Sequence, residues 1–251
     1  MTTYTINVQQ EMSLPKVLGV IFIPSSLLTV LYLITGGVGH TIPSLLIFYI
    51  WATLILFPIE LGVVLYASKK EYGNYSLKSA FAHDEKMSGW KIFLYGALLF
   101  AFAGLMSATL APLENSLFAP ISNKLIQVMP AYFEWNNMEY YKQYSKDILL
   151  LTCVAYFILN VFVGPIIEEL FFRGYLTSKI SRYGNFAPLI ITVLFSLYHL
   201  WLPFGNLFRI SIFFPAAWLA WKKKSIYISI VFHCLCNLLS TVSFIMAVYA
   251  L

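Results

Sequence analysis

Long apolar runs are the feature that most constrains the fold of this chain. A helix needs about 20 mostly apolar residues to cross the hydrocarbon core of a bilayer, and runs of this kind recur along the sequence. The chain is 60% hydrophobic and only 11% charged, whereas a soluble domain has roughly 25% charged residues. A membrane β-barrel would show short alternating segments instead. We therefore predict an all-α, polytopic transmembrane helical bundle.

Seven segments are candidate spans, and a break in one of them would raise the number to eight. They are 17–35, 45–67, 91–111, 148–167, 186–202, 207–221 and 225–250. Gly164-Pro165 is expected to break or kink the fourth span, because proline lacks a backbone donor and clashes with the preceding turn. Whether residues 165–181 then form a separate helix stays open.

The basic residues predict how the chain lies in the membrane, because short cytoplasmic loops carry an excess of Lys and Arg. Such residues cluster in 69–91, 179–185 and 222–224, whereas 36–44 has none. The segment 112–147 carries three Lys against four acids, and its Tyr and Trp side chains suit a membrane interface. This distribution predicts an integral protein of the cell membrane with a cytoplasmic N-terminus and an extracytoplasmic 112–147 segment. The net charge of +5 fits anionic lipid as a partner and needs no nucleic acid.

Two adjacent carboxylates, Glu168 and Glu169, are the only acidic residues after Asp147. Carboxylates at membrane depth are costly and often functional. Glu169 and Arg173 are four residues apart, so they share a helix face and can pair, while Glu168 points about 100° away. We therefore predict that Arg173 holds Glu169 and that Glu168 faces a cavity as a general base for water. The alternative is a purely structural buried ion pair.

Three further polar groups lie in the apolar segments that follow: His199, His233 and Asn237. Counted at 1.5 Å per residue from the basic loops, Glu168 and His199 lie at a depth of about 21 Å, Asn237 at about 20 Å and His233 at about 14 Å. These similar depths predict that the four groups meet in one polar cavity. A satisfied core histidine and an interhelical hydrogen-bonding pair are the alternatives for His199 and for His233 with Asn237.

The three motifs together resemble those of the CAAX protease and bacteriocin-processing (CPBP, or Abi) family of intramembrane proteases. The motifs are complete and in order: Glu168-Glu169-Leu-Phe-Phe-Arg173, Phe195-Ser-Leu-Tyr-His199 and His233-Cys-Leu-Cys-Asn237. The resemblance covers about 148–240. It implies a peptidase similar to CAAX prenyl endopeptidases, with 148–251 as the catalytic transmembrane core. Residues 1–147 would add transmembrane helices and the extracytoplasmic segment to one integrated membrane domain.

The resemblance also implies a role for each motif residue. Glu168 would activate water with His199 beside it, Glu169 and Arg173 would orient the site, and His233 with Asn237 would bind the oxyanion. The substrate would be a peptide or protein, prenylated or not, that reaches a cavity in the membrane. The family has also been described as metalloproteases, and a Glu with two His can hold zinc. We favour metal-independent chemistry, because the ligands come from different helices, and keep zinc as the alternative.

A non-enzymatic membrane protein is the competing class, as an immunity protein, a scaffold or a transporter. Intramembrane ionisable residues also mark ion pathways. A transporter would often show an inverted repeat with paired broken helices, and we find no internal repeat. Glu60 in the second predicted span is a weaker candidate for function, which we expect to pair across helices or to reach the interface.

Overall fold

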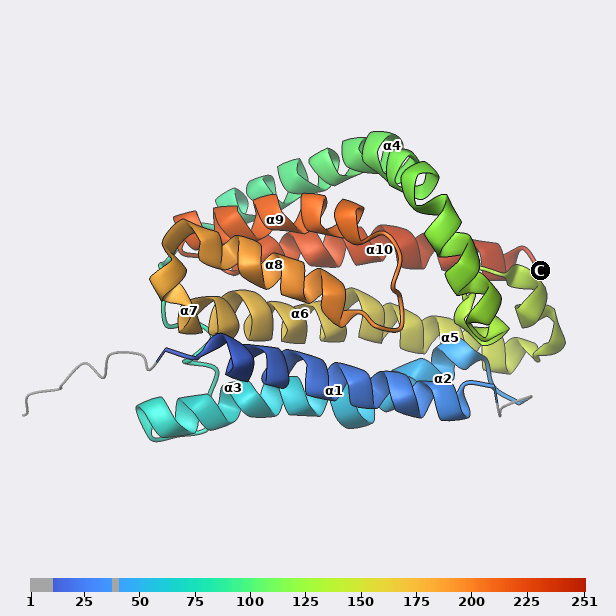
Figure 1. Cartoon of the computed structure of the whole chain (residues 1–251), viewed down its shortest axis with the longest axis horizontal. Coiled ribbons are helices and arrows are strands. Elements are labelled where there is room, and N and C mark those ends of the chain that lie inside the picture. Colours follow the sequence, from blue (N-terminus) through green and yellow to red (C-terminus); the bar gives the residue numbers. More distant parts are fainter. Residues whose placement is uncertain (1–10, 38–40) are drawn as a thin grey trace, which may run out of the picture.

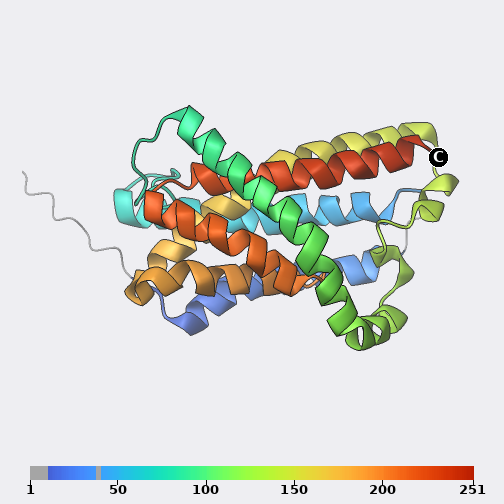
Figure 2. The same ribbon diagram turned by 90° about the horizontal axis from the view of Figure 1, so that it is seen from above.

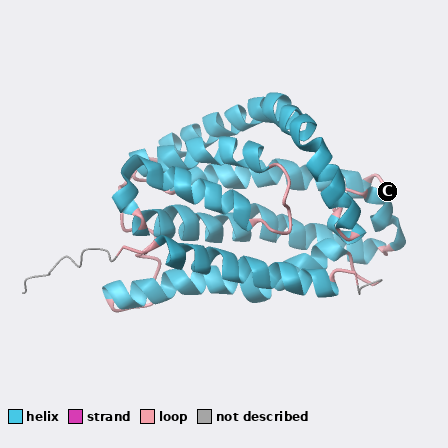
Figure 3. Ribbon diagram, in the orientation of Figure 1, coloured by secondary structure: helices cyan, strands magenta, loops and turns pink. Residues whose placement is uncertain are grey.

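The computed structural model describes residues 11–37 and 41–251. Every regular element within these ranges is a helix, and the long helices lie side by side in one bundle (Figures 1 and 3). The predicted all-α class is therefore confirmed. The predicted cytoplasmic position of the N-terminus concerns residues 1–10, which lie outside the described residues.

Five helical stretches of the described chain are long and apolar enough to cross a membrane, and they coincide with five of the predicted spans. They are Leu14–Thr35 (α1), Ser44–Tyr72 (α2, Ser44–Trp51; a π-helical turn, Ala52–Leu56; α3, Phe57–Tyr72), Gly89–Val128 (α4), Lys146–Lys179 (α5 to α7) and Tyr227–Tyr249 (α10). The other two predicted spans are the shorter helices Ala187–Tyr198 (α8) and Asn206–Lys223 (α9). With 12 residues, α8 reaches about 18 Å, less than the roughly 30 Å of a hydrocarbon core. The total number of spans stays a prediction.

The helix that carries the acidic pair runs on through Gly164-Pro165. Of the predicted break or kink, the break is therefore wrong and the kink stays a prediction. The helix comprises α5 (Lys146–Ile158), a π-helical turn (Leu159–Val163), α6 (Gly164–Glu168), a second π-helical stretch (Glu169–Leu176) and α7 (Thr177–Lys179). The first π turn loosens the hydrogen-bond ladder directly before the proline, where a regular turn would clash. A Cβ on Gly164 would lie 3.3 Å from the Phe57 ring, so glycine allows α3 to pack closely there.

Helix α4 is the longest element, with 40 residues and two internal prolines, Pro112 and Pro120. It packs on α9 and α10 and crosses them obliquely (Figure 2). Beyond its end the chain forms two short 3-10 turns, Ala131–Phe133 and Met138–Gln143.

Aromatic side chains of this predicted extracytoplasmic segment pack inward against the helices of the bundle. The Trp135 indole donates to the Tyr32 hydroxyl at 2.7 Å, and the Trp135 ring packs against Phe48 with 4.8 Å between ring centroids. Tyr141 is buried against Phe244. The segment therefore covers one end of the bundle, close to the cavity described below.

Candidate active site

Glu169 is held by two partners in a fully buried setting. Arg173 Nη1 lies 3.1 Å from Glu169 Oε1, and His233 Nδ1 lies 2.9 Å from the same oxygen. The Arg173 guanidinium also lies 4.0 Å from the Phe195 ring centroid, which adds a cation–π contact. The predicted pairing of Glu169 with Arg173 is confirmed, and both side chains lie behind the cavity wall.

Glu168 has a different environment, although it is the adjacent residue. Its side chain lines a large cavity, and its Oε1 accepts a hydrogen bond from the Tyr198 hydroxyl at 2.7 Å. Its other oxygen, Oε2, lies 3.7 Å from His233 Nε2. Tyr198 on α8 and His233 on α10 therefore orient Glu168, whereas Arg173 holds Glu169.

Tyr198 is a site residue that the sequence reasoning missed. It is fully buried and directly precedes His199 within the second motif. A phenol at the end of an apolar helix needs a hydrogen-bond acceptor, and this was the signal available in the sequence.

His199 follows the last residue of α8, at the edge of the cavity. Its Nδ1 lies 2.8 Å from the Phe195 carbonyl oxygen, one of the carbonyls that a helix end leaves without a backbone partner. A carbonyl only accepts, so Nδ1 carries the hydrogen, and Nε2 of the neutral ring remains free to accept one. The ring is thus fixed in the tautomer that a base or a water-orienting group requires.

Asn237 belongs to a second polar wall, built around Asn160. The Asn237 Nδ2 donates to the Asn160 carbonyl at 2.9 Å. Asn160 accepts from the Tyr49 hydroxyl and donates to Thr241, each at 2.8 Å. Asn160 lies in the π-helical turn before Pro165, and the sequence reasoning missed it. Its signal was an uncharged polar residue within an apolar span.

His233 and Asn237, predicted as one oxyanion-binding pair, therefore have separate partners. The first is bonded to Glu169 and the second to Asn160. Both nevertheless line the cavity.

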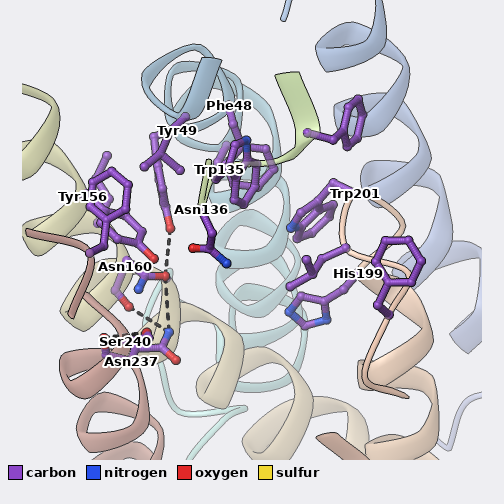
Figure 4. Close-up of a pocket in the computed structure, with 18 of the residues that line it drawn as sticks. Phe48, Tyr49, Trp135, Asn136, Tyr156, Asn160, His199, Trp201, Asn237 and Ser240 are labelled. Atoms are coloured by element: carbon purple, nitrogen blue, oxygen red, sulfur yellow. Dashed lines mark hydrogen bonds between the residues drawn. The ribbon is translucent and has the colours of Figure 1, made fainter. Parts of the chain in front are cut away.

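One cavity of about 740 Å³ brings the predicted groups together, since Glu168, His199, His233 and Asn237 all line it. His199 and Trp201 lie on one side, the Asn160 and Asn237 wall lies on the other, and Asn136 projects between them (Figure 4). The N-terminal half of the chain thus contributes to the walls, although it carries no recognised motif.

A zinc centre does not fit the side chains that the structure describes. Among them, no group of three His, Cys, Asp or Glu residues is placed to hold a metal ion. Both nitrogens of His233 face the two glutamates, and His199 uses Nδ1 for a backbone carbonyl. Metal independence of the reaction stays a prediction.

Comparison with known proteins bears on the C-terminal half of the chain. Residues 150–239 match the family model of type II CAAX prenyl endopeptidase Rce1-like proteins. Comparison of the chain with curated proteins and with solved structures gave no match. The matched range includes all three motifs, and together with the long apolar helices it indicates an integral membrane protein. Residues 150–239 are therefore similar to type II CAAX prenyl endopeptidase Rce1-like proteins, in agreement with the motifs, and this similarity indicates a membrane peptidase that acts on peptides or proteins.

Proposed function

We propose that this protein is an intramembrane endopeptidase in which Glu168 activates a water molecule. The observation that carries the proposal is the contrast between the two adjacent carboxylates. Glu169 is neutralised by Arg173 and bonded to His233. Glu168, by contrast, faces the cavity and accepts one hydrogen bond from the described part of the chain, from Tyr198. A carboxylate placed in this way has lone pairs left for a water molecule.

The reaction needs two proton transfers, one from water to Glu168 and one from Glu168 to the leaving amide nitrogen. Glu168 takes a proton from water as the water oxygen attacks the peptide carbonyl carbon. It then gives this proton to the amide nitrogen as the C–N bond breaks, leaving a carboxylic acid and an amine. His199 accepts the second hydrogen of the water through Nε2 and so orients the attack. The amide of Asn237 donates to the oxyanion, which donors aimed at developing charge stabilise. Nε2 of His233 donates as well when both ring nitrogens carry hydrogens, because Nδ1 already donates to Glu169.

The substrate in this proposal is a peptide segment that enters the cavity from the membrane. Aromatic side chains such as Phe48 and Trp135 line the cavity beside its polar walls. They offer an apolar surface for a lipid-modified or membrane-embedded segment. We propose a prenylated peptide as the first substrate to test. We also propose that the protein lies in the cell membrane with its own N-terminus on the cytoplasmic side.

The experiment is hydrolysis by purified protein in liposomes. The probe is an internally quenched peptide that ends in a farnesylated cysteine and three further residues, with the unprenylated peptide beside it. We expect cleavage by wild type and none by Glu168→Gln. The matched control is Glu85→Gln, since Glu85 pairs with Lys224 in an exposed bridge remote from the cavity, and it should cleave like wild type.

Two results would count against the proposal. Equal cleavage by wild type and Glu168→Gln would sink the role of Glu168. Absence of cleavage of either peptide by wild type would favour the scaffold or transporter alternative. A chelator tests the cofactor question in the same assay, because activity that is lost with EDTA and restored by zinc would contradict a metal-free reaction.

A further inference from the structure

Glu60 is a buried carboxyl group that the proposed mechanism does not use. Glu60 lies in the first turn of α3, two residues after Pro58, and it is 0% exposed. Neither of its oxygens has a hydrogen-bond partner among the described residues. A carboxyl group buried without a partner is costly, and far more so when it is ionised.

The surroundings of Glu60 connect it to the candidate active site. Helix α3 packs against α6 and the π-helical stretch that follows it, the elements that carry the acidic pair. The Glu60 carboxyl lies near enough to the Tyr198 hydroxyl and the Glu168 carboxylate to interact with both, although it forms no hydrogen bond with either in the described structure. Tyr198 interacts with both carboxyl groups, and its hydroxyl donates to Glu168 Oε1 at 2.7 Å. Three buried groups on α3, α8 and α6 thus form one row.

The hydrogen-bonding capacity of these groups locates the proton in the row. A phenol has one hydrogen, and Tyr198 gives it to Glu168 because an ionised carboxylate can only accept. The Tyr198 oxygen then offers only lone pairs to Glu60. Glu60 can bond to it only as a neutral acid that donates its own O–H. An ionised Glu60 would place a second negative charge beside Glu168 in a water-poor site.

We infer that Glu60 is a positioning residue for Glu168: a neutral carboxylic acid that donates to Tyr198, which in turn holds Glu168 aimed at the cavity. This row polarises the Tyr198 O–H and strengthens its bond to the Glu168 carboxylate. Glu60 keeps its proton throughout, since Glu168 exchanges protons only with water and the leaving amine. The catalytic consequence rests on the proposed function, whereas the location of the proton does not.

The first test is the infrared spectrum of the purified protein at pH 8, where Asp84, with its pKa raised by burial to about 6, is ionised. Wild type should show a protonated-carboxyl C=O band that shifts in D₂O. The band should disappear in Glu60→Gln and persist in Glu168→Gln. A wild type without the band, or a Glu60→Gln variant that retains it in full, would overturn the inference.

The second test uses peptide hydrolysis and a double-mutant cycle. Glu60→Leu removes the donor to Tyr198, so we expect kcat to fall about tenfold with KM unchanged, the scale of one lost hydrogen bond. Glu60→Gln is the matched control, because its amide N–H can still donate, and it should keep kcat within about threefold of wild type. In a Tyr198→Phe background, Glu60→Leu should cause no further loss.

A merely structural role for Glu60 predicts different numbers. Equal loss of kcat in both Glu60 variants, or the same factor of loss with and without the Tyr198 hydroxyl, would overturn the inference. If wild type cleaves no peptide, the proposed function has failed, and the infrared test still decides where the proton resides.

Discussion

The two halves of this chain differ in what they contribute to the cavity. Residues 148–251 carry the three motifs and the groups proposed to react, Glu168 and His199. Residues 11–147 carry no recognised motif, yet they supply Asn136 and aromatic wall residues. The difference teaches that motifs mark the reacting groups, whereas their placement and the shape of the cavity depend on residues without a sequence signature.

Glu114 on α4 shows how far the C-terminal half depends on the N-terminal one. Its Oε1 and Oε2 accept from the backbone N–H groups of Leu207 and Phe208 at 2.9 and 2.6 Å. A helix start leaves such N–H groups without partners, and a carboxylate there satisfies them and complements the helix dipole. Glu114 thus fixes the start of α9 and with it the loop that follows His199.

The comparison predicts that substitutions in the motif half mainly lower kcat. His199→Ala removes the group that orients water, so we expect kcat to fall about 10²–10⁴-fold, the range for a general acid–base group. Initial rates on the quenched peptide measure it. A rise in KM with kcat unchanged would instead place His199 in substrate binding and would contradict the comparison.

The buried pair behind the cavity should matter for stability. Glu169→Leu leaves Arg173 as an uncompensated buried cation, and we expect a loss of about 3–5 kcal/mol in the free energy of unfolding. Glu169→Leu with Arg173→Leu should recover much of that loss, since no charge is left unpaired. Thermal unfolding in detergent measures both variants. Equal stability of the single and the double variant would contradict this account of the pair.

The motif-free half should act on substrate binding. Asn136 projects into the cavity (Figure 4), where its amide can bond to a peptide backbone. Asn136→Ala should raise KM about fivefold with little change in kcat, the effect of about one lost hydrogen bond. If Asn136→Ala lowered kcat as much as His199→Ala does, the two halves would not differ in their roles in binding and catalysis.

The smallest expected effect concerns Asp84, in the loop before α4, whose Oδ2 accepts from the Ile226 N–H at 3.1 Å. Burial raises the pKa of Asp84 from its ordinary value near 3.8 to about 6. The folded protein therefore binds this proton more tightly than the unfolded chain, and its stability declines as pH rises from about 4 to about 6. Asp84 is only half-buried, so the decline should be about 1 kcal/mol or less.

Asp84→Asn keeps an acceptor for Ile226 and removes the titration. Thermal unfolding between pH 4 and pH 8 should therefore show a flatter profile for this variant than for wild type. Parallel profiles for the two proteins would show that the pH dependence has another source.

What the sequence allowed us to predict follows from geometry within single helices. The i,i+4 spacing was enough to pair Glu169 with Arg173 and to turn Glu168 away. Counting residues from the basic loops was enough to bring His199 and Asn237 into one cavity with Glu168.

The remaining features depend on contacts between helices that no local pattern encodes. The helix continues past Pro165 because a π-helical turn precedes it, and α3 packs closely at Gly164. The bond from Tyr198 to Glu168 and the position of Glu60 join three helices, and neither residue follows a periodic signal.

The most direct test of the central claim is a comparison of membrane peptidomes from cells that make wild type, Glu168→Gln or Glu85→Gln at equal abundance. The account predicts cleavage products that are present with wild type and Glu85→Gln and absent with Glu168→Gln. Identical peptidomes in the three strains would contradict it.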